Sequence, residues 1–258
     1  MRHHLHAEWT KLRTVTGTGR LLFAVVALTV AMSAAAAATV FCPSAGCGYD
    51  VPKLSLIGVQ VGQAAVAILA VLAISGEYGT GMIRTTLAAM PRRAAVLAAK
   101  AAVLAGLTLA AGTVAVLGSV LTGRLILPGK GFTPAHGHPL LSLADGPTLR
   151  AAVGSVLYLA LIALLSLGVA TAVRDSATAI GVVLGLLYVL SILPLMIADP
   201  GWQLFLWRIS PMNAGLAVQA TTRLSSLPLS PWAGLGVLAA WAAAALLGGG
   251  SLLRLRDT

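Results

Sequence analysis

Six long stretches of almost uncharged residues constrain this chain more than any other feature. Each is long enough to form a helix of about 20 residues, which crosses roughly 30 Å of hydrocarbon. The runs are continuous and rich in Ala, Leu and Val, which favours helices over the alternating segments of an outer-membrane barrel. The sequence predicts an all-α polytopic membrane protein with a single transmembrane domain. The expected spans are Arg20 to Phe41, Leu54 to Ser75, Ala94 to Leu127, Leu149 to Val173, Ser176 to Ala198 and Pro231 to Leu253.

Composition agrees with this class, because 58% of the residues are hydrophobic and 9% are charged, with a mean hydropathy of +0.93. The first run, with its basic start and the tract "SAAAAAT", also resembles a secretory signal. Signal cores are usually about 7 to 15 residues long, so the length of this run favours a span.

The basic residues predict the orientation. With the N-terminus inside, eleven Lys and Arg residues fall on the inner side and six on the outer side, so both termini are expected in the cytoplasm. The net charge of +10 is then explained by this anchoring and by contact with anionic lipid, without nucleic-acid binding.

Motifs for chemistry within the chain are missing from the sequence. It contains neither H-E-x-x-H nor G-x-S-x-G, and "GRLILPGKGF" lacks the spacing of a phosphate loop. None of the seven acids lies deep in a span, which argues against a buried proton relay. We therefore expect no catalytic residue, no metal site and no cofactor in this chain.

Cys42 and Cys47 follow the first span in a C-x4-C pattern on the expected outer side. A disulfide and two free thiols are both compatible with this spacing. A metal site is disfavoured for these cysteines, which have no nearby His, and for "HGHP" (136–139), which shows no third ligand.

The stretch "GEYGTGMIRTTLAAMPRR" follows the second run and crowds an acid, hydroxyls, glycines and arginines together. On a helix its polar residues share one face and its apolar residues the other, which predicts an amphipathic coupling helix at about 76–91 on the cytoplasmic surface. An ordinary inside loop with Arg92 and Arg93 as headgroup anchors is the alternative.

The longer stretch "GEYGTGMIRTTLAAMPRRAAVLAAK" resembles the segment after the second membrane helix in permease subunits of the ABC-2 type transporter family, the transmembrane subunits of ABC exporters. The resemblance implies that this helix docks on a separate ATP-hydrolysing subunit. The contact residues it implies are Glu77, Tyr78, Gly79, Thr80, Arg84, Thr85 and Leu87.

Two further stretches resemble the same family. "HAEWTKLRT" is similar to the amphipathic elbow helix before the first span, here within residues 1–19. "LFLWRISPMNAGLAVQA" is similar to the outer segment that dips back into the membrane as broken helices, although an ordinary outer loop also fits residues 199–230.

The resemblance implies a permease subunit in a bacterial plasma (inner) membrane, which exports an apolar or amphipathic compound such as a drug, an antibiotic or a lipid-like molecule. Its implied partners are two copies of an ABC ATPase, which bind ATP and Mg, and a second permease chain. A non-transporting immunity or scaffold protein is the alternative, and a membrane-embedded enzyme is a less favoured one.

Polar residues inside two spans are the candidates for the translocation path, because polar groups prefer a bundle interior or a water-lined path over lipid. Plain interhelical hydrogen bonding explains them equally well. Two Gly-x-x-x-Gly patterns, Gly58 to Gly62 and Gly181 to Gly185, are candidates for an intersubunit seam. The path candidates are Gln60, Gln63, Tyr188 and Ser191.

Overall fold

The computed structural model describes residues 16–43, 47–79 and 93–255, and the regular elements in these ranges are all helical. The long helices and their short neighbours, in chain order, are α2 (Thr16–Thr39), α3 (Val51–Ser55), α4 (Val59–Gly79), α6 (Arg93–Ile126), η1 (Leu127–Lys130), η2 (Pro134–His136), α7 (Gly146–Val173), α8 (Ser176–Leu184), η3 (Gly185–Val189), α9 (Leu190–Met196), α10 (Pro200–Ile209), α11 (Pro211–Leu216), η4 (Ala217–Gln219), η5 (Leu224–Ser226) and α12 (Pro231–Leu255).

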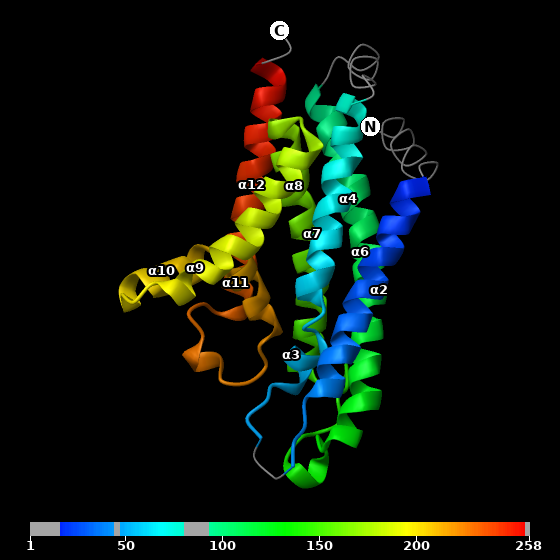
Figure 1. Cartoon of the computed structure of the whole chain (residues 1–258), viewed down its shortest axis with the longest axis vertical. Helices are drawn as coiled ribbons and strands as arrows, with labels where there is room; N and C mark the ends of the chain where they lie inside the picture. Colours follow the sequence, from blue (N-terminus) through cyan, green and yellow to red (C-terminus); the bar gives the residue numbers. More distant parts are fainter. Residues whose placement is uncertain (1–15, 44–46, 80–92, 256–258) are drawn as a thin grey trace.

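Within the described ranges, six helical stretches are long and apolar enough to cross a membrane, which confirms the six predicted spans. The start of α2 and the end of α12 lie at the same end of the bundle (Figure 1), as an even number of crossings requires. The length and composition of these helices therefore indicate a multi-pass membrane protein.

The second long helix begins at Val59, later than the predicted Leu54, because a separate short helix precedes it. Asp50 caps α3 by accepting a hydrogen bond from the Lys53 N–H (3.2 Å), and Pro52 lies in its first turn. A turn at residues 56–58 then redirects the chain into α4.

Helix α7 lies at the centre of the bundle and contacts α4, α6, α8 and α12 (Figure 1). It is apolar around its whole circumference, as expected for a helix enclosed by others, and it is buried along most of its length. Small residues permit the closest approach, since a Cβ added at Gly168 would lie 2.4 Å from the carbonyl carbon of Ala245 on α12.

The first Gly-x-x-x-Gly pattern packs two helices of the same chain together. A Cβ added at Gly58 would lie 1.9 Å from the Thr29 carbonyl oxygen of α2, and one at Gly62 would lie 2.0 Å from the Thr29 hydroxyl. The pattern thus serves contact between α2 and α4, and the prediction of an intersubunit seam there is wrong. Gly181 and Gly185 face open space, with no atom within 4 Å of an added Cβ.

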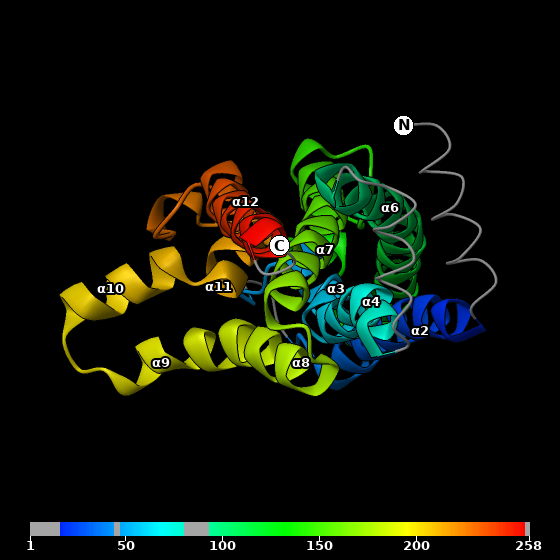
Figure 2. The ribbon, with the colours of Figure 1, turned by 90° about the horizontal axis from the view of Figure 1, so that it is seen from above.

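The fifth span is not a regular α-helix. After α8 the chain forms a single π-helical turn, η3, and continues into α9, which contains Pro194. A π-turn and an internal proline both interrupt the hydrogen-bond ladder of a helix. Helices α9 and α10 then pack on each other and project sideways from the bundle (Figure 2), with Met196 79% and Trp202 62% exposed.

The segment 199–230 contains the short helices α10, α11, η4 and η5, and its re-entry into the membrane stays a prediction. Asp199 caps the start of α10, and Ser210 ends α10 and caps α11. Helix α11 packs closely on α12, since a Cβ added at Gly234 would lie 1.9 Å from the Ala214 carbonyl oxygen.

The predicted elbow and coupling helices fall largely outside the described residues. Residues 1–15 are not described, and residues 16–19 belong to α2. Helix α4 extends to Gly79, so the first residues of the coupling stretch continue the second span past the predicted end at Ser75, whereas residues 80–92 are not described.

Candidate functional site

A row of polar side chains crosses the interior of the bundle where α4, α7, the π-turn η3, α9 and α11 meet. Tyr158 of α7 donates a hydrogen bond to the Gln63 Oε1 of α4, and both side chains are fully buried. The Gln63 Nε2 lies 3.2 Å from the Met212 sulfur of α11. We call this set the polar seam; its members are Gln60, Gln63, Tyr158, Tyr188, Ser191, Ser210 and Asn213.

The broken segments supply the other half of the polar seam. The Tyr188 hydroxyl, which lies on η3, donates to the Gln60 carbonyl oxygen (2.6 Å). The Ser191 and Ser210 hydroxyls are 2.9 Å apart, and the Asn213 amide donates to the Ser191 carbonyl oxygen (3.1 Å). Hydrogen bonds between elements therefore tie the first turn of α4 to the fifth span and to α11.

A cavity of about 290 Å³ opens beside the polar seam. Gln60, Ser191 and Asn213 form its polar side, and among the described residues that line it Lys53 is the charged one. The remaining wall is mainly apolar and is made by Ile192, Leu195, Trp207, Met212, Ala214, Leu216, Ala217, Leu227, Pro228 and Leu229. A cavity with apolar walls and a few convergent polar groups is the usual form of a small-molecule site.

The structure brings the four predicted path residues together, although two different spans contribute them. Gln60 and Ser191 line the cavity, whereas Gln63 is buried behind it and Tyr188 bonds the backbone of α4. The interhelical bonding considered from sequence is therefore present for Gln63 and Tyr188. Their role in a translocation path stays a prediction.

Sequence reasoning missed three members of the polar seam: Tyr158, Ser210 and Asn213. Tyr158 could have been found, because it is the bulkiest polar residue in the fourth span. Ser210 and Asn213 lie in a segment without periodicity, where the helix-starting patterns Asp-Pro (199–200) and Ser-Pro (210–211) are the local signals of order.

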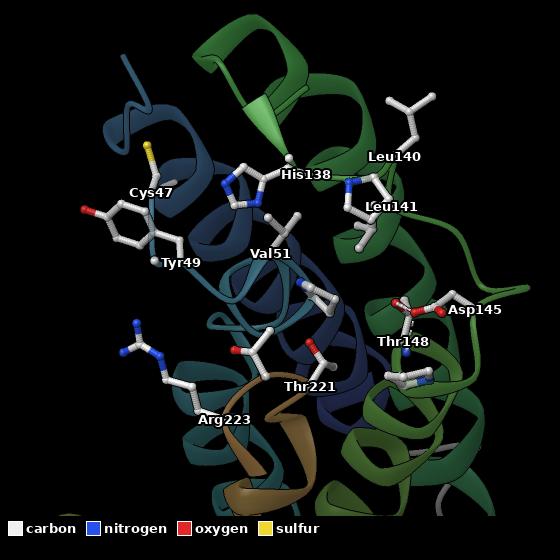
Figure 3. A pocket seen from close by; sticks show the side chains of 16 residues that line it. Cys47, Tyr49, Val51, His138, Leu140, Leu141, Asp145, Thr148, Thr221 and Arg223 are labelled. Carbon is white, nitrogen blue, oxygen red and sulfur yellow. Dashed lines mark hydrogen bonds between the residues drawn. The ribbon is translucent and has the colours of Figure 1, made fainter. Parts of the chain in front are cut away.

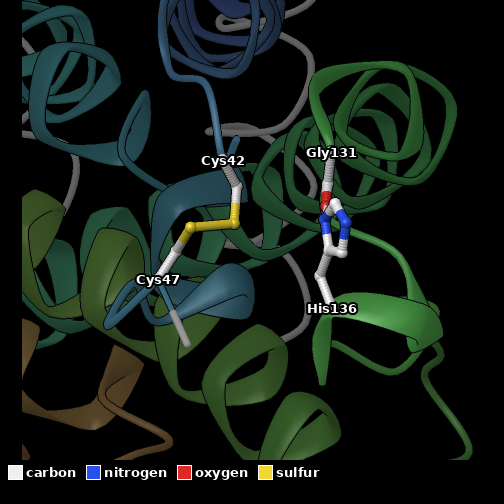
Figure 4. Close-up of a disulfide and its surroundings, with 4 residues drawn as sticks. All are labelled: Cys42, Cys47, Gly131 and His136. Atoms are coloured by element: carbon white, nitrogen blue, oxygen red, sulfur yellow. Dashed lines mark hydrogen bonds between the residues drawn. A yellow bond between two sulfur atoms is a disulfide. The ribbon is translucent and has the colours of Figure 1, made fainter. Parts of the chain in front are cut away.

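A disulfide joins Cys42 and Cys47 (Figure 4) at the end of the molecule opposite the start of α2. Of the two alternatives that the C-x4-C spacing left open, a disulfide or two free thiols, the structure has the disulfide. The Cys42 N–H donates to the Lys130 carbonyl oxygen (2.8 Å). Gly131, at a φ of 93°, lies so close that an added Cβ would be 2.1 Å from the Cys42 carbonyl oxygen.

The two histidines of "HGHP" serve different contacts. His136 Nδ1 is 2.7 Å from the Gly131 carbonyl oxygen (Figure 4), and the His138 ring packs edge-on against Phe132. Within residues 16–43, 47–79 and 93–255, no group of three or more His, Cys, Asp or Glu side chains could hold a metal ion.

Of the predicted ATPase contacts, Glu77, Tyr78 and Gly79 form the last turn of α4. Thr80, Arg84, Thr85 and Leu87 lie outside the described residues. The polar seam and the coupling stretch are thus joined by one helix, with Gln60 and Gln63 near its first turn and Glu77 in its last.

In comparisons with known proteins, the chain matches no family model and no curated protein.

Proposed function

We propose that this chain is the permease subunit of an ATP-driven transporter of the ABC-2 type, which exports an amphipathic compound. The cavity beside the polar seam is the observation that carries the proposal, because it lies at a break in the fifth span between groups that could bind a cargo. Two partner ATPases supply ATP hydrolysis, and a second permease chain completes the path.

The cavity lining supports an amphipathic cargo over a purely hydrophilic one. Most lining side chains are apolar, and the polar groups Gln60, Ser191 and Asn213 converge on one side. A volume of about 290 Å³ is near the lower end for ligand pockets, so it suits one moiety of a larger molecule that extends into lipid. Lys53, with no carboxylate among the lining residues, favours neutral or anionic head groups.

Helix α4 supports a route from ATP hydrolysis to this cavity. It is an unbroken helix of 21 residues, with the predicted ATPase contact at one end and the polar seam at the other. Because a helix transmits displacement along its axis, movement at Glu77 would reach Gln60 and Gln63. The switch of access is then a rigid-body shift of α4 against the broken fifth span.

The first experiment tests the partner. The chain is purified in mild detergent, and bound proteins are identified by mass spectrometry for wild type, Glu77→Ala and Arg92→Ala/Arg93→Ala. The proposal expects an ABC ATPase with wild type and its loss with Glu77→Ala, since truncating one partner of a desolvated contact costs about 2 to 5 kcal/mol. Arg92→Ala/Arg93→Ala should retain the ATPase in the fraction that inserts.

An immunity or scaffold protein makes different forecasts. It would bind no ATPase, and Glu77→Ala would leave protection intact. Absence of an ATPase from wild type, or equal recovery with Glu77→Ala, would contradict the proposed coupling.

A second experiment tests the cavity. Ser191→Leu fills its polar side, whereas Ser251→Leu places the same side chain at an exposed position near the end of α12. The proposal expects Ser191→Leu to abolish export while the ATPase still co-purifies, and Ser251→Leu to export as wild type does. Full export by Ser191→Leu would contradict the proposal that the cavity is part of the translocation path.

A further inference from the structure

A second cavity, separate from the one beside the polar seam, lies at the end of the molecule that carries the disulfide (Figure 3). It has a volume of about 520 Å³, within the usual range for ligand pockets. We call it the outer pocket. Its walls come from the loop after Cys47, the start of α3, the chain from Gly137 into α7, and the segment that follows η4. Among the described residues, the two cavities have no lining residue in common, so part of the chain separates them.

Segment 221–230, a loop between α11 and α12 (Figure 1), belongs to the wall of both cavities. Residues 221–223 line the outer pocket, whereas residues 227–229 line the cavity beside the polar seam. Neighbouring residues of α3 are divided in the same way, because Pro52 lines the outer pocket and Lys53 lines the other cavity. The two cavities therefore lie on either side of the contact between α3 and this segment, which we call the outer flap.

The chain is anchored on both sides of the outer flap. Before it, the buried Gln219 donates from Nε2 to the Ser155 hydroxyl (3.0 Å), and the Ala220 carbonyl oxygen accepts from the Arg150 Nη2 (2.7 Å). After it, Pro231 is buried at the start of α12. The structure describes every residue of the outer flap, and none of them is buried. The outer flap thus crosses the surface between two fixed points without being part of the core.

One carboxylate holds the first residues of the outer flap. The Asp50 side chain accepts hydrogen bonds from the N–H groups of Thr221 (2.6 Å) and Thr222 (3.0 Å) and from both of their hydroxyls (2.6 and 3.3 Å). We call this contact the Asp50 clamp. Asp50 is half-buried and Thr222 is exposed, so water can replace these hydrogen bonds when the clamp opens.

The other contacts of the outer flap are also polar and open to water. The Arg208 Nε of α10 donates to the Pro228 carbonyl oxygen (3.2 Å) in an exposed hydrogen bond. The Arg223 guanidinium lies over Gly48, where an added Cβ would be 3.0 Å from Nη2. A segment with exposed hydrogen bonds and little buried apolar surface opens at a lower free energy than a packed helix does. The outer flap is therefore the part of the wall between the cavities that opens most easily.

We propose that the outer flap is the exit gate of the cavity beside the polar seam. When the Asp50 clamp opens, residues 221–230 lift, the two cavities join, and the cargo leaves through the outer pocket. This inference rests on the proposed export function and adds the exit route to it. Arg208 links the outer flap to α10, which packs on α9, so a shift of the broken fifth span is passed to the gate.

The first test needs neither an ATPase nor a cargo. Ser191→Cys places a thiol in the cavity beside the polar seam, while the native cysteines are bonded to each other. Its rate of reaction with an impermeant maleimide outside intact cells is compared with and without Asp50→Asn. Asparagine keeps the cap of α3, but its amide nitrogen accepts no hydrogen bond, so part of the clamp is lost. We expect Asp50→Asn to raise the rate roughly tenfold, equivalent to the loss of one or two hydrogen bonds.

Two controls separate the gate from a general loosening of the fold. Asp145→Asn makes the same change at an acid that lines the outer pocket but bonds only Thr148 of α7 among the described residues, so the Ser191→Cys rate should not change. Ser119→Cys places a thiol at a fully buried position of α6 that lines neither cavity, and Asp50→Asn should not change its rate. Equal rates at Ser191→Cys with and without Asp50→Asn, or a similar rise at Ser119→Cys, would overturn the gate.

The second test asks whether export requires the outer flap to open. Asp50→Cys/Thr222→Cys replaces the clamp with two thiols that a short bis-maleimide joins. We expect the joined form to retain the ATPase and export nothing, and the same variant capped with a monofunctional maleimide to export. Export by the joined form would overturn the gate and leave the proposed function standing. The expected labelling rates without any export by wild type would support the gate and contradict the proposed function.

Discussion

The Asp50 clamp gives the sharpest stability prediction. Asp50→Ala removes the N-cap of α3, which is worth about 1 kcal/mol. It also removes four hydrogen bonds to Thr221 and Thr222, at 2.6 to 3.3 Å. Asp50 is half-buried, so water can replace part of each bond, and about 0.5 to 1 kcal/mol per bond is appropriate. The expected loss in the free energy of unfolding is about 3 to 5 kcal/mol.

The assay is reversible unfolding in mixed micelles, titrated with sodium dodecyl sulfate and followed by tryptophan fluorescence. Asp199→Ala is the matched control, because Asp199 also caps a helix through one backbone N–H but makes no such clamp. It should cost about 1 kcal/mol. If Asp50→Ala proved no more destabilising than Asp199→Ala, the clamp would not hold the outer segment in place.

Three further predictions test packing, topology and titration. Gly168→Ala should destabilise the bundle by about 1 to 3 kcal/mol, because its Cβ would meet the α12 backbone, whereas Gly181→Ala faces open space and should be neutral or stabilising in the same unfolding assay. After reduction, the two disulfide cysteines should react with an impermeant maleimide outside intact cells, and a cysteine placed at Thr258 should not. The reverse labelling would contradict the predicted orientation of the chain in the membrane. Hydrogen bonds from the Thr178 hydroxyl and N–H lower the pKa of the Asp175 carboxyl, so the stability that these bonds give α8 is present above the ordinary pKa of Asp and is lost as pH falls through the lowered pKa. Carbon-13 NMR of labelled aspartate, with Asp175→Asn for assignment, should show a titration midpoint below the ordinary value. A midpoint at or above the ordinary value would contradict the prediction.

The spans were predictable because the constraint that fixes them is local. A run of about 20 apolar residues must cross the bilayer as a helix, and no tertiary contact is needed to recognise it. The polar residues of the second and fifth spans were predictable as a set for a similar reason. Polar groups within a span need partners, so Gln63 and Ser191 were expected to face the interior.

The features that the sequence did not reveal depend on contacts between distant residues. Asp50 meets Thr221 across 171 positions, and no periodic pattern marks either residue. That contact holds the segment whose residues Thr221, Thr222 and Arg223 line the cavity at the disulfide end. The Gly-x-x-x-Gly pattern at Gly58 was visible, but its partner could be read only from the packing of α4 on α2.

The π-turn was likewise hidden, since residues 185–189 read as an ordinary apolar helix. Only Pro194, one turn later, signals that the span is interrupted. The cavity beside the polar seam exists because this break and the short helices α10 and α11 lie against each other, so its shape could not be derived from the spans alone.

The most direct test of the proposed function is ATP-driven movement of cargo in proteoliposomes that contain the purified chain and its ATPase. A fluorescent amphipathic compound is loaded, and its movement is followed with ATP, with a non-hydrolysable analogue, and with Ser191→Leu in place of wild type. We expect movement only with ATP and the wild-type chain, and none with Ser191→Leu. Movement that is independent of ATP hydrolysis, or equal for Ser191→Leu and wild type, would contradict a transport path through the cavity beside the polar seam.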